Sequence, residues 1–135
     1  MIRRSVILLV DDEKTVLDSL SEQLRRFWSS VVEFETAESA EEAWELLREL
    51  AEARVEVAVV VSDWLMPGQR GDEFLAQLRL AYPHTGRIML TGQADPLALE
   101  RVRSEASAHR ILFKPWQPEE LRDAILQAST METLV

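Results

Sequence analysis

The fold of this chain is decided by the stretch Val57-Ala58-Val59-Val60-Val61-Ser62-Asp63-Trp64-Leu65-Met66-Pro67-Gly68, in which an apolar, β-branched run ends on one carboxylate and a turn follows at once. Such a run predicts a strand that is buried on both faces of a parallel sheet. Ligands of open parallel sheets bind outside the carboxyl ends of the strands, which is where Asp63 falls. We therefore expect Asp63 to be a reactive group. The alternative is a carboxylate that only caps the turn through an Asx hydrogen bond.

The length and composition indicate one globular domain. A chain of 135 residues fits one hydrophobic core, and its 29% of charged residues is ordinary for a soluble protein. The longest apolar runs, Val6 to Val10 and Val57 to Val61, are too short to span a bilayer. The basic start, Met1 to Arg4, leads into a strand that ends in two acids, so it is not a signal peptide. We expect a cytoplasmic protein without membrane association.

The absence of cysteine and the excess of acids narrow the chemistry further. Without cysteine the chain has no disulfides, thiol catalysis or cysteine metal sites. The formal net charge of −9 argues against direct binding of nucleic acid by this domain. It is compatible with binding a cation or a basic partner surface.

Strand and helix signals alternate five times along the sequence, which predicts right-handed βαβ units and a parallel sheet with helices on both faces. The fold class is therefore α/β with three layers. The predicted strands are residues 5–10, 31–36, the run ending at Asp63, 87–91 and 110–113. The predicted helices follow each strand, and the last four begin at the capping-box pattern Ser39 to Glu42, at Gly71, at Asp95-Pro96 and at Pro118.

The carboxyl end of nearly every predicted strand carries a chemically useful side chain. These residues are Asp11 and Asp12, Asp63, Thr91 and Lys114. Each has a simpler explanation when taken singly: a helix N-cap for Asp11 or Asp12, a turn residue for Thr91, a solvated loop residue for Lys114. A parallel sheet, however, brings all of them to the same edge, which predicts one shared site.

Three neighbouring carboxylates repel one another unless positive charge is close. Lys114 supplies one positive charge, and a divalent cation would supply two. Hard oxygen ligands without His or Cys favour Mg²⁺. Mg²⁺ and a lysine together stabilise a transferring phosphoryl group, a carboxylate there can act as nucleophile, and the Thr91 hydroxyl can donate to a phosphoryl oxygen.

Five short motifs occur in one order along the chain: Val-Asp-Asp-Glu at 10–13, Ser-Asp-Trp-Leu-Met-Pro-Gly at 62–68, Gly71, Leu-Thr-Gly at 90–92 and Lys-Pro-Trp at 114–116. As an ordered set they resemble the receiver domain of bacterial two-component response regulators, and the likeness covers about residues 5 to 128. The resemblance implies a flavodoxin-like, doubly wound (βα)5 sheet with strand order 2-1-3-4-5. It also implies a receiver over residues 1–128, followed at 129–135 by a tail or the start of a linker to an output domain.

The resemblance also implies a role for each site residue. It makes Asp63 the phosphoacceptor, Asp12 a direct Mg²⁺ ligand, Asp11 a ligand through water, the Leu65 backbone carbonyl a further ligand, Thr91 the switch hydroxyl, and Lys114 the phosphate-binding lysine before a cis Pro115. The phosphodonor would be a phosphohistidine on a sensor histidine kinase or a phosphotransfer protein. Such a domain is regulatory and catalyses only its own phosphorylation and dephosphorylation.

Two departures from the family pattern concern the output of the switch. Gln69 and Arg70 replace the usual Met and Asp, and Ile111 replaces the usual Tyr or Phe. A β-branched side chain is stiff and has no ring to swing inward. We therefore expect the signal to leave through the 92–94 loop and the helix that starts at Asp95-Pro96. The face of that helix, the last strand and the final helix is the expected partner or homodimer surface.

The Lys-Pro-Trp motif and the Leu-Thr-Gly-Gln-Ala-Asp stretch resemble the corresponding segments of receivers that are joined to cyclic-nucleotide signalling domains.

Three other functions are alternatives to the phosphorylated receiver. A haloacid-dehalogenase-like phosphatase would use Asp11 of Asp11-x-Glu13-x-Thr15 as nucleophile. The second acid of that family's motif is usually Asp, whereas this chain has Glu13. A receiver-like binding module that is not phosphorylated usually lacks an acid or the lysine, and this chain keeps all of them. A flavodoxin-like cofactor binder is disfavoured because Asp11-Asp12-Glu13 would repel a phosphate.

Overall fold

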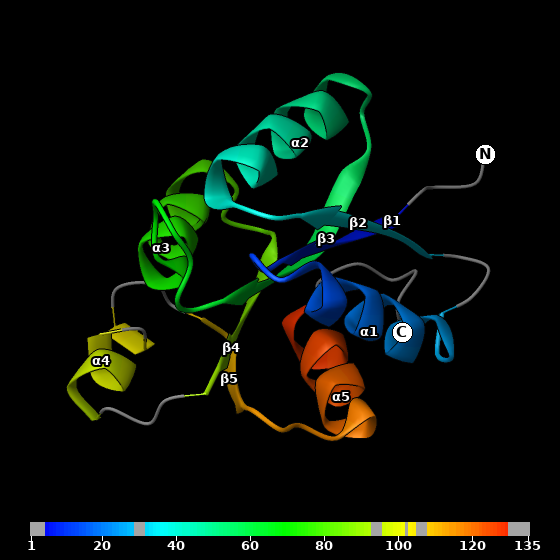
Figure 1. Ribbon diagram of the computed structural model, residues 1–135. Coiled ribbons are helices and arrows are strands. Elements are labelled where there is room, and N and C mark those ends of the chain that lie inside the picture. Colours follow the sequence, from blue (N-terminus) through cyan, green and yellow to red (C-terminus); the bar gives the residue numbers. More distant parts are fainter. Residues whose placement is uncertain (1–4, 29–31, 93–95, 102, 105–107, 130–135) are drawn as a thin grey trace.

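A computed structural model describes residues 5–28, 32–92, 96–101, 103–104 and 108–129. Five parallel strands form one sheet in the order β2-β1-β3-β4-β5, and a helix follows each strand (Figure 1). The strands are β1 (Ser5–Val10), β2 (Val32–Ala37), β3 (Glu56–Asp63), β4 (Gly86–Thr91) and β5 (Arg110–Phe113). The helices are α1 (Lys14–Arg25), α2 (Ala40–Glu52), α3 (Gly71–Ala81), α4 (Pro96–Arg101) and α5 (Pro118–Ala128). The predicted fold class and strand order are confirmed.

The central strands are buried on both faces, as their continuous apolar runs predict. All six residues of β1 are buried, and so are the last six of β3. Ile7 and Leu9 belong to the core under α1 and α5, whereas Leu8 and Val10 belong to the core under α2 and α3. Figure 1 shows these two helix pairs on opposite sides of the sheet, which makes three layers.

A bulge in β3 sets the register that positions Asp63. Val6 pairs with Val57 and Ile7 pairs with Val59, so Ala58 is the extra residue. Beyond the bulge the pairing is regular, and Ser62 lies opposite Val10. Asp63 therefore lies level with the residue that follows β1.

The element boundaries mostly follow the predicted signals. The Ser39 hydroxyl accepts the Glu42 N–H at 3.1 Å, but the Glu42 carboxylate accepts the N–H of Glu38 instead of that of Ser39. The capping-box prediction is therefore correct in one of its two hydrogen bonds. The predicted start of a strand at Val31 and the N-cap at Asp95 lie outside the described residues.

The last strand and its surroundings carry the remaining sequence predictions. The Lys114–Pro115 peptide bond is cis, as the resemblance implied. Ile111 is partly buried against the α2 and α3 side of the core. Of the predicted output loop, Gly92 is described and residues 93–94 are not, so its displacement stays a prediction. Within the described ranges, no helix has the length and apolar character needed to cross a membrane.

Candidate functional site

The carboxyl edge of the sheet, where β1, β3, β4 and β5 end, gathers the residues that the sequence singled out. Carboxylate oxygens of Asp11, Asp12 and Asp63 all lie within 4.8 Å of one another. The Lys114 Nζ lies 3.1 Å from Asp63 Oδ1. Thr91 is the last residue of β4, beside them. Residues that are up to about a hundred positions apart in the sequence thus form one cluster.

Neighbouring strands hold the backbone of these residues in place. The Asp11 N–H donates to the Ala37 carbonyl at 3.1 Å, and the Lys114 N–H donates to the Thr91 carbonyl at 2.9 Å. Both bonds continue the pairing of the sheet one residue past a strand end. The side chains therefore project from backbone that the sheet makes rigid.

Asp11 is the member of the cluster whose negative charge is least compensated by its surroundings. It is 1% exposed, and its Oδ1 accepts the Glu13 N–H at 2.9 Å. The N-cap residue of α1 is Glu13, so the alternative of a helix N-cap at Asp11 or Asp12 is wrong. Its Oδ2 has no hydrogen-bond partner in the described structure, and the nearest cation, Lys114 Nζ, lies 3.9 Å away. Burial, together with the charges of Asp63 and Asp12, raises the pKa of Asp11 to about 6, although the Glu13 N–H and the Lys114 charge act to lower it. A buried, unpartnered carboxylate oxygen indicates a place for a cation.

The hydrogen bonding of the Asp63 carboxylate differs from that of an Asx cap. It is 8% exposed, and its Oδ1 accepts from Lys114, whose side chain is one-third exposed. Within the part of the chain that the structure describes, no backbone N–H of the following turn donates to the Asp63 carboxylate. The geometry favours a reactive carboxylate held by a lysine over an Asx cap.

A cavity of about 380 Å³ opens over this carboxylate. It is lined by Asp12, Glu13, Asp63, Trp64, Leu65, Thr91, Gly92 and Lys114. Asp12 is exposed to solvent, whereas Asp11 is buried and is not part of the lining. Three carboxylates, one lysine and an unpartnered buried oxygen fit a hard divalent cation such as Mg²⁺.

The turn after Asp63 contains a buried network that sequence reasoning missed. The Trp64 indole Nε1 donates to Asp72 Oδ1 at 3.1 Å. Arg70 forms a two-pronged ion pair with the same carboxylate, from Nε to Oδ1 and from Nη2 to Oδ2, each at 3.1 Å. The signal available in the sequence was Trp64 itself, because a buried indole N–H needs an acceptor.

Gly71 allows α3 to begin against β3, the strand that carries Asp63. Its N–H donates to the Trp64 carbonyl at 2.7 Å, and a Cβ at this position would lie 2.0 Å from the Asp63 carbonyl oxygen. Any larger residue would push α3 away from β3. Close packing of α3 against β3 is therefore the reason why this position of the sequence motif requires glycine.

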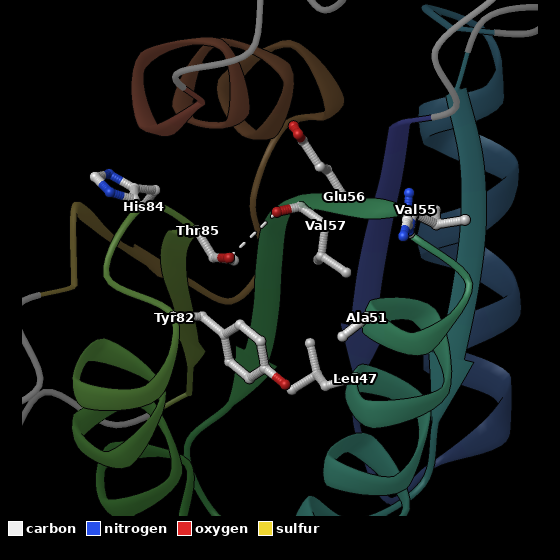
Figure 2. A pocket seen from close by; sticks show the side chains of 9 residues that line it. Leu47, Ala51, Val55, Glu56, Val57, Tyr82, His84 and Thr85 are labelled. Carbon is white, nitrogen blue, oxygen red and sulfur yellow. Dashed lines mark hydrogen bonds between the residues drawn. The ribbon is translucent and has the colours of Figure 1, made fainter.

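The amino edge of the sheet, at the start of β3 and β4, holds a larger hollow of about 550 Å³ (Figure 2). It is lined by Leu47, Ala51, Arg54, Val55, Glu56, Val57, Tyr82, His84 and Thr85. The Thr85 hydroxyl donates to the Val57 carbonyl at 3.2 Å, as Figure 2 shows. Among the described residues, the acid cluster with metal-site spacing lies at the carboxyl edge and not here.

Comparison with known proteins agrees with this geometry. The family model described as "Response regulator receiver domain" matches residues 7–126. The chain belongs to this family. Receiver domains act in two-component signalling, typically bind Mg²⁺ at an acidic pocket, and belong to response regulators that interact with histidine kinases or phosphotransfer proteins.

Matches to individual relatives extend over nearly the whole chain. This chain is 34% identical over 126 residues to the hydrogenase transcriptional regulatory protein HoxA of Cupriavidus necator, and the match covers 93% of this chain and 24% of HoxA. It is 27% identical over 125 residues to the chemotaxis protein CheY1 of Helicobacter pylori, covering 88% of this chain and 92% of CheY1. The receiver domain therefore spans about a quarter of HoxA but nearly all of CheY1.

A solved structure shows the same fold. The signal receiver domain of an HD domain-containing protein from Pseudomonas fluorescens Pf-5 matches with a TM-score of 0.81 and 35% identity, covering 93% of this chain and 94% of that one. The regulatory class of the domain follows from these findings, and the roles of its residues are taken up below.

Proposed function

We propose that this receiver domain is a phosphorylation-dependent signalling switch in which Asp63 accepts a phosphoryl group from a sensor histidine kinase or a phosphotransfer protein, with Mg²⁺ as the cofactor. The observation that carries the proposal is the cluster of Asp11, Asp12 and Asp63 with the Lys114 ammonium 3.1 Å from the Asp63 carboxylate. A cap or a solvated lysine would not require this convergence.

The reaction uses the side chains already in place. A carboxylate oxygen of Asp63 attacks the phosphorus of the donor phosphohistidine, and the new O–P bond forms as the P–N bond breaks. The electron pair stays on the imidazole nitrogen, which takes up a proton. Lys114 donates to a phosphoryl oxygen, and the Thr91 hydroxyl donates to another from the cavity wall.

The metal site is assigned by accessibility. Asp12, Asp63 and the Leu65 backbone carbonyl are proposed as direct ligands because these residues line the cavity. Asp11 is buried outside the lining, which suits contact through a water molecule. Bound Mg²⁺ would supply positive charge to the phosphoryl oxygens and to the crowded carboxylates.

The output is proposed to leave through the segment after Gly92, with α4, β5 and α5 as the partner or homodimer surface. Leu97 on α4 and Phe113 on β5 are exposed at 78% and 44%, which supports a contact face. We further propose that residues 1–128 form the receiver and 129–135 a tail or linker. A cytoplasmic location is part of the same proposal.

The phosphatase alternative is weakened by the burial of its nucleophile. Asp11 is 1% exposed and does not line the cavity, so a substrate phosphate would not reach it without rearrangement. A receiver-like binding module would have the same fold and the same residues but would not take up a phosphoryl group. The phosphorylation experiment therefore separates it from our proposal.

The test is incubation with acetyl phosphate and Mg²⁺, followed by intact-protein mass spectrometry. The parent should gain one acid-stable, base-labile phosphoryl group, and Asp63→Asn should gain none. Asp18→Asn, which removes an exposed acid on α1, is the matched control and should be labelled like the parent. Labelling of Asp63→Asn at the parent level would refute the acceptor assignment, and an unlabelled parent would favour the binding module.

A further inference from the structure

The segment that follows the phosphoacceptor is held by hydrogen bonds from two different elements. The Trp64 N–H donates to the Leu90 carbonyl of β4 at 3.1 Å, and the Trp64 carbonyl accepts from Gly71 at the start of α3. The indole Nε1 adds a third bond, to Asp72 on the first turn of α3. Trp64 thus connects the sheet, through its N–H, to α3, through its carbonyl and its indole.

The third bond depends on Arg70. The Asp72 side chain is 10% exposed, so its charge is largely removed from water, and Arg70 compensates it with a two-pronged ion pair. The Arg70 side chain is 40% exposed and so keeps part of its own hydration. Without Arg70, the buried carboxylate would keep only the indole as a partner and would be strongly disfavoured there.

This network lies against the proposed chemistry. Trp64 is 8% exposed and lines the same cavity as Asp63 and Leu65, its two neighbours in the chain. Arg70 stands where the family pattern usually has Asp. The departure is therefore accompanied by an ion pair that holds one wall of the cavity.

We propose that Arg70 and Asp72 are positioning residues of the metal and phosphoryl site: by holding Trp64, they keep the Asp63 carboxylate and the Leu65 carbonyl in the arrangement that binds Mg²⁺. This inference rests on the proposed function, since it assigns the Mg²⁺ site to that cavity. Residues that are hydrogen-bonded to metal ligands typically affect metal affinity about 10- to 100-fold, and because Arg70 and Asp72 act through Trp64, the lower end of that range is expected.

The test measures binding of Mg²⁺ alone by isothermal titration calorimetry, together with melting temperatures with and without Mg²⁺. Asp72→Ala should weaken Mg²⁺ binding by about 10-fold. Asp72→Asn keeps one carbonyl oxygen for the indole and should restore part of the affinity. Glu73→Gln is the matched control: it removes an acid from the same helical turn and breaks the 3.2 Å Arg70–Glu73 ion pair, but leaves the pair with Asp72 intact.

A merely structural role predicts a different pattern. It would lower the melting temperature equally with and without Mg²⁺ and leave the Mg²⁺ affinity unchanged, which would overturn the proposal. Equal weakening by Asp72→Ala and Glu73→Gln would also overturn it, because the effect would then be one of general charge. If Asp72→Ala does not fold, Arg70→Gln, which changes the more exposed partner, decides the matter by the same criteria.

The parent protein separates this inference from the proposed function. A parent that does not bind Mg²⁺ at millimolar concentration contradicts the proposed metal site itself, and with it this inference. A parent that binds Mg²⁺ and takes up a phosphoryl group, alongside an Asp72→Ala variant of equal affinity, contradicts only the positioning role.

Discussion

The two edges of the sheet differ in what their cavities contain. The amino edge has the larger hollow, about 550 Å³ against 380 Å³, and one of its polar lining groups, the Thr85 hydroxyl, donates to the Val57 carbonyl. The carboxyl edge has three acids in mutual contact range and a buried oxygen of Asp11 that lacks a hydrogen-bond partner. Unbalanced charge, more than the size of a hollow, is the reason for proposing the carboxyl edge as the functional site.

Alanine substitutions of one glycine at each edge should have the largest effect on stability. Gly71→Ala at the carboxyl edge would place a Cβ 2.0 Å from the Asp63 carbonyl oxygen, and Gly86→Ala at the amino edge would place one 2.6 Å from the Ala128 carbonyl oxygen. Overpacking against backbone should lower the free energy of unfolding by about 3 kcal/mol in each variant.

The two variants should differ in their response to metal. The clash at Gly71→Ala is with the Asp63 carbonyl oxygen, whereas the clash at Gly86→Ala is with Ala128 of α5, so Gly71→Ala should be the variant that reduces the stabilisation by Mg²⁺. Urea denaturation with and without Mg²⁺ measures both effects. An unchanged Mg²⁺ response in Gly71→Ala would remove the proposed link between the start of α3 and the site.

Asp11→Asn should raise the stability of the metal-free protein at neutral pH. Because the pKa of Asp11 is raised from 3.8 to about 6, its contribution to folding is fully present below pH 3.8 and is lost as the pH rises through 6. Asparagine keeps an acceptor for the Glu13 N–H and removes the charge. The variant should exceed the parent by on the order of 2 kcal/mol at pH 7.5.

This gain should shrink as the pH falls toward 4, where the parent carboxyl is neutral in both states. Denaturation curves between pH 4.5 and 8, without metal, provide the check. Added Mg²⁺ should stabilise the parent more than the variant, which lacks the negative charge. A pH-independent difference would show that Asp11 is not electrostatically strained.

The smallest effect on stability is expected at the amino edge. Thr85→Val removes the 3.2 Å bond to the Val57 carbonyl and should cost about 1 kcal/mol of unfolding free energy. Mg²⁺ affinity and phosphoryl uptake should match the parent, as measured by calorimetry and mass spectrometry. A change in either would mean that the two edges are coupled through β3.

The sequence predicts the positions of the site residues because each lies at the end of a strand that the sequence pattern indicates. A parallel sheet then fixes which end of every strand faces the same way, so Asp11, Asp63 and Lys114 meet without any knowledge of side-chain packing. The same reasoning predicts the strand order only through the family resemblance, since the residue pattern alone does not order the strands.

What the sequence did not predict depends on how helix ends and strand registers pack. The Trp64–Asp72 bond requires the first turn of α3 to fold back over an indole eight residues earlier in the chain. The bulge at Ala58 lies within a run of similar apolar residues, where no side chain distinguishes one register from the next. The Glu38–Glu42 bond depends on the approach angle of the chain to α2, which local pattern does not determine.

The central claim is that the carboxylate of Asp63, and not that of Asp11, receives a phosphoryl group. The most direct measurement is borohydride reduction of the protein after incubation with acetyl phosphate, which converts an aspartyl phosphate to homoserine, followed by peptide sequencing by mass spectrometry. We predict homoserine at position 63, formed only when Mg²⁺ is present. Homoserine at position 11, or none at position 63 with Mg²⁺ and donor in excess, would contradict the account.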